Sequence, residues 1–120
     1  MFHHVGLVVG SLNEVVPDGE RTVDEIQKVA IAFRSIHGLP VEYLEPLGDD
    51  SPVMASLRKG QRLLHLCFSV PDLDAAIHEG RNRGFSCIAR PVPATAFAGR
   101  RIAWLFSKTY GLIELVEQDD

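Results

Sequence analysis

The chain has 120 residues, a hydrophobic content of 46% and a formal net charge of −4, as expected for one globular domain or two small modules sharing one core. The acidic balance argues against a general nucleic-acid-binding protein, and no apolar run approaches the ~18 residues of a membrane span. No secretory leader is evident, and Cys67 and Cys87 form no CxxC pair, so we expect a cytoplasmic protein with reduced thiols.

Residues 1–46 predict a first module with three strands and almost no helix. The strands are predicted by runs that alternate or are rich in β-branched residues, over residues 2–9, 28–33 and 41–45. Ser11 begins a helix-capping pattern, but Pro17-Asp18-Gly19 ends the helix after about one turn. Residues 20–25 are polar and predict a loop, and a turn begins at Gly38.

Residues 47–61 predict a connector between this module and a second one over residues 62–120. Within the connector, Ser51-Pro52 predicts the start of a short helix. The helix is expected to continue through about Leu57 and to end at Gly60.

The second module contains similar strands and a complete helix. Its strands are predicted over residues 64–70, 85–89, 101–106 and 112–117. Asp72 is expected to cap the helix and Gly84 to end it, and residues 91–99 predict a loop. In the first strand, alternation predicts a buried face of Leu66, Phe68 and Val70, with the opposite face formed by His65, Cys67 and Ser69.

The two modules read as copies of one sequence. Residues 4–9 align with 65–70, residues 28–33 with 101–106, and residues 41–45 with 113–117. Three matches in the same order indicate an internal duplication.

The first module is shorter than the second by about a dozen residues, at the place where the second keeps its helix. Without that helix, Val5, Leu7 and Val9 are expected to form an exposed apolar face. We expect a homodimer or higher oligomer to cover this face.

Each module offers one histidine on its first strand and one glutamate on its last, namely His4 with Glu42 and His65 with Glu114. If a pseudo-twofold axis relates the modules, these four side chains converge. Two imidazoles and two carboxylates suit a divalent metal and leave coordination positions open for substrate. Each residue alone has an ordinary interpretation on a sheet surface or in a core, but their recurrence at matched positions favours a metal site.

The chain resembles the vicinal oxygen chelate superfamily, which includes glyoxalase I, extradiol dioxygenases and methylmalonyl-CoA epimerase. The resemblance is strongest to the epimerase branch, over residues 41–53, 99–105 and 112–117. It implies an α+β fold in which paired βαβββ modules form a curled, cup-shaped mixed sheet, here with a truncated first helix. It also implies that the family's metal ligands correspond to four residues of this chain, His4, Glu42, His65 and Glu114.

The resemblance implies a metal-dependent isomerase or lyase that stabilises an enolate of a small carbonyl or acyl-CoA substrate, like methylmalonyl-CoA epimerase. The cofactor is expected to be a divalent metal: cobalt, nickel, zinc, manganese or magnesium. Glu114 is the first candidate for ligand and base and Glu42 the second, because an epimerase needs a base on each face of the reacting carbon.

Two other functions stay open. One is a non-catalytic protein that binds or sequesters small molecules, which the truncated helix favours. The other is an extradiol-type dioxygenase, but that chemistry prefers two histidines and one carboxylate on iron, so the fourth candidate ligand weighs against it.

Arg100, Arg101 and Lys108 flank the last two strands and are candidates for holding a substrate carboxylate or a CoA phosphate. The alternative is that they are ordinary solvated charges at strand ends.

Overall fold

The structure is a computed structural model that describes residues 1–118. The chain divides into two compact units. The N-terminal unit is residues 4–64, and the C-terminal unit is residues 65–118 together with residues 1–3. The predicted connector therefore belongs to the N-terminal unit. No helix within residues 1–118 is both long and apolar enough to span a membrane.

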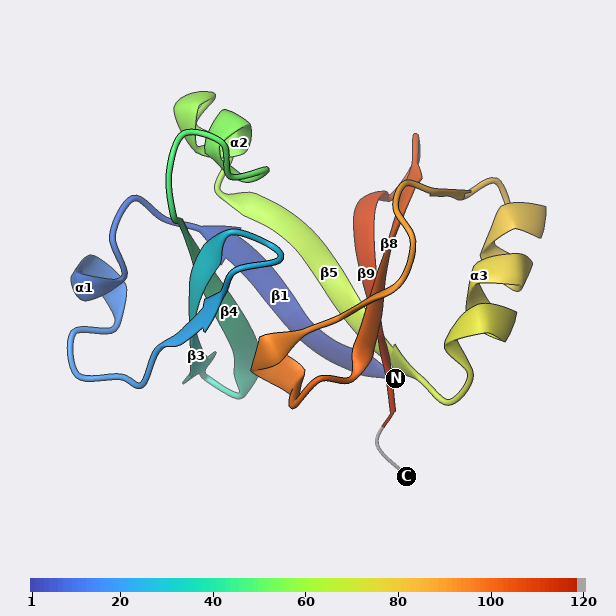
Figure 1. The fold of residues 1–120 in the computed structure, drawn as a ribbon, viewed down its shortest axis with the longest axis horizontal. Helices are drawn as coiled ribbons and strands as arrows, with labels where there is room; N and C mark the ends of the chain where they lie inside the picture. The colour runs from blue at the N-terminus through green and yellow to red at the C-terminus, as the bar shows by residue number, and fades with distance from the viewer. Residues whose placement is uncertain (119–120) are drawn as a thin grey trace. The chain divides into compact units, whose positions relative to one another are not determined.

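The N-terminal unit contains a mixed sheet in the order β2-β3-β4-β1 (Figure 1). The strands are β1 (Phe2–Val8), β2 (Thr22–Asp24), β3 (Val29–Ile36) and β4 (Leu39–Pro46). Strands β1 and β4 pair in parallel, whereas β3 pairs antiparallel with both β2 and β4. His37 and Gly38 link β3 to β4 with φ angles of 48° and 85°, the left-handed pair that a tight two-residue hairpin turn requires.

The predicted loop at residues 20–25 contains the edge strand β2, which corrects the sequence-based expectation. Its last residue, Asp24, is buried, and Asp24 Oδ1 accepts hydrogen bonds from the amides of Ile26 and Gln27 at 3.0 Å each. The buried carboxylate thus closes the turn into β3. A three-residue strand with polar ends shows too little alternation to be recognised in sequence.

Two short helices complete the N-terminal unit, α1 (Leu12–Val15) and α2 (Met54–Arg58). The capping prediction for α1 is confirmed, because the Ser11 side chain accepts from the amide of Asn13 at 3.3 Å. Helix α2 begins at Met54, two residues later than expected from Ser51-Pro52, and has no side-chain cap.

The core of this unit forms where α1 meets the sheet. Its buried residues are Leu12, Val16, Ala30, Ala32, Val41 and Tyr43. Leu7 and Val9 pack against this cluster, so the expected exposed face on β1 is partly covered. One helical turn and the residue after it supply this cover, because they place Leu12 and Val16 in the cluster against which Leu7 and Val9 pack.

The strands of the C-terminal unit are hydrogen-bonded in the order β5-β9-β8-β6, with β7 also paired to β8. The strands are β5 (Leu63–Val70, which starts in the N-terminal unit), β6 (Ser86–Cys87), β7 (Val92–Pro93), β8 (Arg101–Ser107) and β9 (Gly111–Glu117). Strands β5 and β9 are parallel, and β8 is antiparallel to its neighbours. Both units therefore pair their first strand with their last in parallel, as expected of a duplication.

Helix α3 (Leu73–Asn82) begins as predicted, with the Asp72 side chain accepting from the amide of Ala75 at 3.0 Å. The strand expected over residues 85–89 is only two residues long. The loop expected over residues 91–99 contains β7 and a short 3₁₀ helix, η1 (Thr95–Phe97). These pieces are too short to produce a periodic pattern in the sequence.

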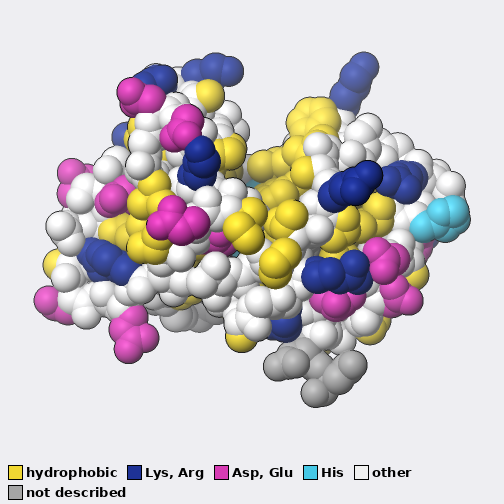
Figure 2. Space-filling model, in the orientation of Figure 1, with side chains coloured by type: hydrophobic (Ala, Val, Ile, Leu, Met, Phe, Trp, Pro, Cys, Tyr) yellow, Lys and Arg dark blue, Asp and Glu magenta, His cyan; other side chains and the backbone are white. Residues whose placement is uncertain are grey.

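The burial of β5 is the reverse of the expectation. His65 and Cys67 are 3% and 0% exposed, whereas Leu66 is 36% exposed. Helix α3 packs on β6, β8 and β9 and leaves part of the β5 face open. The opposite face is covered by a cluster that includes Cys67, Ala94, Phe97, Ile102 and Val116. Figure 2 shows hydrophobic side chains at the surface near α3, beside several Lys and Arg side chains.

Candidate metal centre

The N-terminal unit contains a buried histidine–glutamate pair. His4 Nε2 lies 3.3 Å from Glu42 Oε1, and the two side chains are 0% and 3% exposed. Strand pairing places Gly6, two residues after His4, directly opposite Glu42.

The C-terminal unit contains an equivalent pair. His65 Nε2 lies 3.0 Å from Glu114 Oε1, again with 0% and 3% exposure. The residue opposite Glu114 is Cys67, which is also two positions after the histidine. The same register in both units shows that the duplication extends to the polar side chains.

Each pair also contacts an aromatic ring, which the sequence analysis did not identify. Phe33 lies opposite Glu42 on β3, and its ring meets the His4 ring edge-on at 5.7 Å between centroids. Trp104 lies opposite Glu114 on β8 and meets His65 in the same way at 4.7 Å. The structural repeat thus matches Phe33 with Trp104, two residues away from the sequence alignment with Phe106. The sequence signal that could have identified them is an aromatic residue in each module, on the strand that lies two places from the histidine strand in the sheet.

The donor atoms of each pair suit a divalent cation. Burial of an ionised carboxylate is costly unless a partner compensates its charge, and either a protonated imidazole or a metal ion can do so. Within each pair, the ligand atoms lie within 4.8 Å of each other. Two such atoms can contact one ion at ordinary distances of about 2.0–2.2 Å. One imidazole nitrogen with one carboxylate oxygen fits cobalt, nickel, zinc or manganese.

The structure thus brings His4 to Glu42 and His65 to Glu114. The convergence of both pairs on one ion stays a prediction.

The predicted substrate-binding cations lie at opposite ends of β8. Arg101, at its start, contacts Asp74 at 3.2 Å and Glu117 at 2.8 Å. These two carboxylates, Glu117 more strongly, raise the pKa of Arg101. Arg100 donates to the carbonyls of Phe97 and Glu117 at 3.2 and 3.3 Å. Both arginines therefore have structural partners. Lys108 lies just beyond the other end of the strand.

We expect the Arg101–Glu117 contact to make stability depend on pH. The Arg101 hydrogen bond holds the pKa of Glu117 below its ordinary value. The contribution to folding is therefore complete above the unfolded-state pKa of about 4.3 and is lost as the pH falls through the lower folded-state pKa. Glu117→Gln should lower the urea midpoint slightly at pH 7, and the difference from the parent protein should shrink as the pH falls below about 4. Exposed Glu20 provides the control, Glu20→Gln, and an unchanged midpoint at pH 7 for Glu117→Gln would contradict this expectation.

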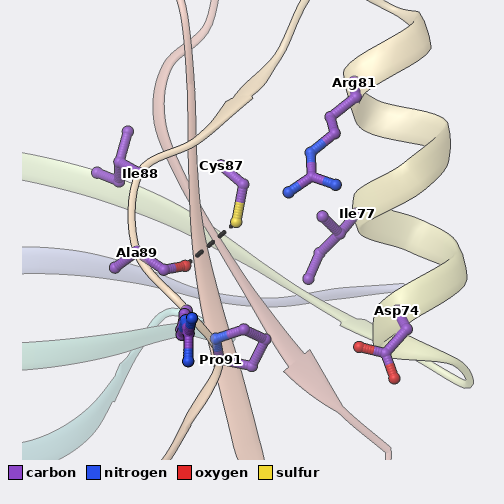
Figure 3. Close-up of a pocket in the computed structure, with 8 residues that line it drawn as sticks. Asp74, Ile77, Arg81, Cys87, Ile88, Ala89 and Pro91 are labelled. Atoms are coloured by element: carbon purple, nitrogen blue, oxygen red, sulfur yellow. Dashed lines mark hydrogen bonds between the residues drawn. The ribbon is translucent and has the colours of Figure 1, made fainter.

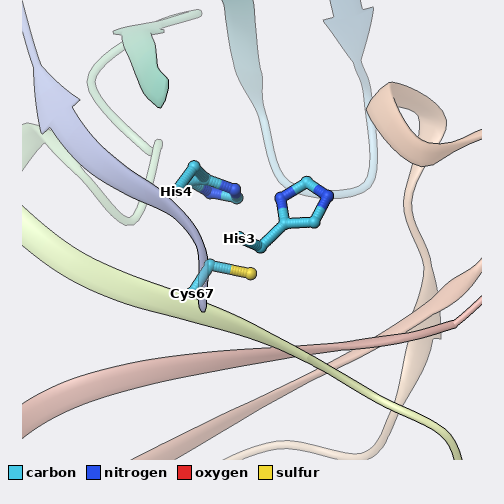
Figure 4. Close-up of side chains that lie close together, drawn as sticks. All are labelled: His3, His4 and Cys67. Carbon is cyan, nitrogen blue, oxygen red and sulfur yellow. The ribbon is translucent and has the colours of Figure 1, made fainter. Parts of the chain in front are cut away.

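Two further groups of side chains in the C-terminal unit have no predicted ligand role. The His3 ring meets the Phe97 ring edge-on at 5.4 Å, and His3 lies within 4.8 Å of the Cys67 thiol; Figure 4 draws these two with the neighbouring His4. A pocket of about 380 Å³ lies beside α3. Figure 3 shows Arg81 and Asp74 on the helix and Cys87 across from them. The Cys87 thiol donates to the carbonyl of Ala89 at 3.2 Å.

Comparison with known proteins supports the fold and the family. The model of the glyoxalase/bleomycin resistance protein/dioxygenase superfamily matches residues 3–104. The uncharacterized protein YqjC of Bacillus subtilis is 32% identical, over 95% of this chain and 89% of its own. Human mitochondrial methylmalonyl-CoA epimerase is 29% identical over 72% of this chain, and the match spans 51% of that relative's length. A variant of Streptomyces coelicolor methylmalonyl-CoA epimerase, solved in complex with 2-nitronate-propionyl-CoA, is 27% identical with a TM-score of 0.81, over 99% of this chain and 97% of its own. The expected α+β fold is confirmed.

Proposed function

This chain belongs to the glyoxalase/bleomycin resistance protein/dioxygenase superfamily, and we propose that it is a metal-dependent isomerase. The reaction is transfer of a proton at the carbon next to a carbonyl or thioester, with an acyl-CoA of the methylmalonyl-CoA type as substrate. The observation that carries this proposal is the buried histidine–glutamate pair that recurs at the same strand register in both units. The epimerases among the relatives support the substrate class.

The proposed metal ligands are His4, Glu42, His65 and Glu114. A divalent ion bound there would supply positive charge to stabilise the enolate oxygen of the substrate. The donor chemistry of each pair supports this assignment, because both histidines direct Nε2 toward a carboxylate oxygen. Neutral imidazole and ionised carboxylate are the forms that bind a metal.

Two of the ligands also have the chemistry to move the proton. The Glu114 carboxylate is proposed to remove the α-proton, and the Glu42 carboxylate to return it on the opposite face of the carbon. Phe33 and Trp104, next to the two pairs, are proposed to exclude water, which strengthens charge interactions at the site.

Metal binding tests the ligand set. With one shared site, the purified protein should bind about one cobalt or zinc ion per chain, measured by mass spectrometry after dialysis. His4→Ala and His65→Ala should each weaken this binding by more than about 100-fold, because loss of a direct ligand exceeds the 10–100-fold cost of losing an outer-shell partner. His78→Ala, an exposed residue on α3, should bind like the parent protein.

The number of bound ions distinguishes one shared site from two separate ones. If each pair held its own ion, the parent would bind two and each variant would still bind one. No binding in excess cobalt would contradict the metal-dependent proposal altogether.

Catalysis is tested by proton exchange. In deuterated water, methylmalonyl-CoA should lose its α-proton signal in the NMR spectrum only when metal-loaded protein is present. Metal and acyl-CoA binding without exchange would instead indicate the non-catalytic binding protein. Bound iron with oxygen uptake on a catechol would indicate the dioxygenase.

The proposal also covers the oligomeric state and the cations that contact the substrate. We propose a cytoplasmic homodimer or higher oligomer, because Leu7 and Val9 are only partly buried and leave apolar surface for a partner chain to cover. Light scattering at micromolar concentration tests the oligomeric state. Arg100, Arg101 and Lys108 remain candidates for contact with the acyl-CoA.

A further inference from the structure

The open part of the β5 face forms the floor of an apolar groove next to α3. The groove has a volume of about 770 Å³, within the range of about 300–1,000 Å³ that is typical of small-molecule sites. Its lining is largely aliphatic and aromatic, and includes Leu66, Phe68, Phe85, Leu105, Ile113 and Leu115. The charged residues in the lining are Glu79 and Arg83, which pair with each other at 3.0 Å. The groove therefore suits an apolar chain.

A polar pocket of about 400 Å³ adjoins this groove, and three residues, Arg83, Phe85 and Tyr110, line both. The Tyr110 ring stacks on the Phe85 ring at 5.9 Å and is 67% exposed, so it forms a shared wall. The other lining residues of the polar pocket include Ser86, Ser107, Lys108 and Thr109.

The charge of the polar pocket is positive. Its lining contains the two cations Arg83 and Lys108 and no acidic side chain. Glu79, on the groove side, balances Arg83, which leaves the Lys108 ammonium as the excess charge. A ligand that extends from the groove into this pocket would thus place an anionic group against a positive surface.

We propose that the groove and the polar pocket together bind a single-chain alkyl anion, such as a medium-chain carboxylate. The chain lies along the groove between α3 and β5, and the carboxylate lies in the polar pocket against the Lys108 ammonium. The hydroxyl groups of Ser86 and Thr109 are available as donors to it. This site involves none of the proposed metal ligands and does not depend on the proposed isomerase activity. It shares only Lys108 with the candidate acyl-CoA contacts.

Chain length provides the first test, with octanoate, decanoate and dodecanoate titrated below their micelle-forming concentrations by calorimetry. Each buried methylene should tighten binding up to about fourfold. Decan-1-ol should bind at least about fivefold more weakly than decanoate, because it lacks the charge. Decyl phosphate shows whether the pocket prefers a carboxylate or a phosphate. In ¹⁵N NMR spectra, decanoate should shift amides of α3, β5 and the turn around Lys108.

Variants separate the contribution of the head group from that of the chain. Lys108→Glu should weaken decanoate binding about fivefold or more and abolish the preference over decan-1-ol. Lys59→Glu, an exposed charge reversal in the N-terminal unit, is the matched control and should bind like the parent. Leu66→Asp should abolish the dependence on chain length, and Tyr110→Ala, at an exposed position, gives a second test if Leu66→Asp is unstable.

Several results would overturn the proposal. Equal binding of decanoate and decan-1-ol would show that the polar pocket does not recognise the anionic group. If decanoate shifted only amide signals of β1 and β4, the ligand would bind elsewhere. A dimer that Leu66→Asp dissociates, with no decanoate binding by the parent, would show that a second copy covers the groove.

Discussion

Glu114→Gln should reduce the rate of α-proton exchange by about 10²–10⁴-fold, the usual contribution of general acid–base catalysis. Glutamine keeps the size of the side chain and an oxygen atom that can bind the metal, but it cannot accept the substrate proton. Glu114 is 2% exposed and 3.0 Å from His65, so few other groups can replace it. Exchange of the α-proton of methylmalonyl-CoA in deuterated water, followed by NMR on protein of measured metal content, gives the rate.

The same strand offers a matched control. Glu117, three residues later, is bound to Arg101 at the surface, so Glu117→Gln should leave the exchange rate within a factor of about two. Glu42→Gln should slow the return of the proton on one face, so that one enantiomer exchanges faster than the other. A Glu114→Gln protein that binds metal and exchanges at the parental rate would contradict the proposed role of Glu114.

Leu12→Ala should lower the free energy of unfolding by about 2–5 kcal/mol, the usual cost of removing a fully buried leucine side chain. Leu12 is 1% exposed and lies in the cluster that includes Val16, Val41 and Tyr43. Its amide also donates to Glu45 Oε1 at 2.8 Å, which holds α1 against β4. The short helix therefore performs the packing that a full helix provides in the C-terminal unit.

Urea denaturation at pH 7 measures this effect, with Leu39→Ala as the control. Leu39 is 44% exposed, and its truncation should change the free energy of unfolding by no more than about 0.5 kcal/mol. A loss below 1 kcal/mol for Leu12→Ala would mean that the cavity collapses and that α1 contributes little to the core.

Much of the fold could be predicted because it depends on the order of apolar, polar and capping residues along short stretches of the chain. The strands that carry His4 and His65 alternate at period 2, and the strands that carry Glu42 and Glu114 are rich in apolar residues. Helix α3 has its capping residue Asp72 and a glycine after its end. The short strands β2, β6 and β7 could not be predicted, because two or three residues carry no periodic signal. They exist because β3 and β8 offer them hydrogen-bonding edges.

The candidate site shows the same division. Sequence duplication identified the histidines and glutamates as matched residues, but it did not identify Phe33 and Trp104. Those rings face the pairs because strand register places them opposite Glu42 and Glu114. A register shift of two residues keeps every side chain on the same face, so alternation in the sequence could not distinguish Trp104 from Phe106.

The sequence by itself thus determined the repeat, the main strands and the donor residues, since each depends on which residues follow one another. Only the tertiary structure decided which face of β5 is buried, where His65 and Cys67 are enclosed and Leu66 is partly exposed. Alternation separates the two faces of a strand but does not say what packs on each. Here α3 covers the neighbouring strands, while residues that follow β6 enclose the face with the histidine.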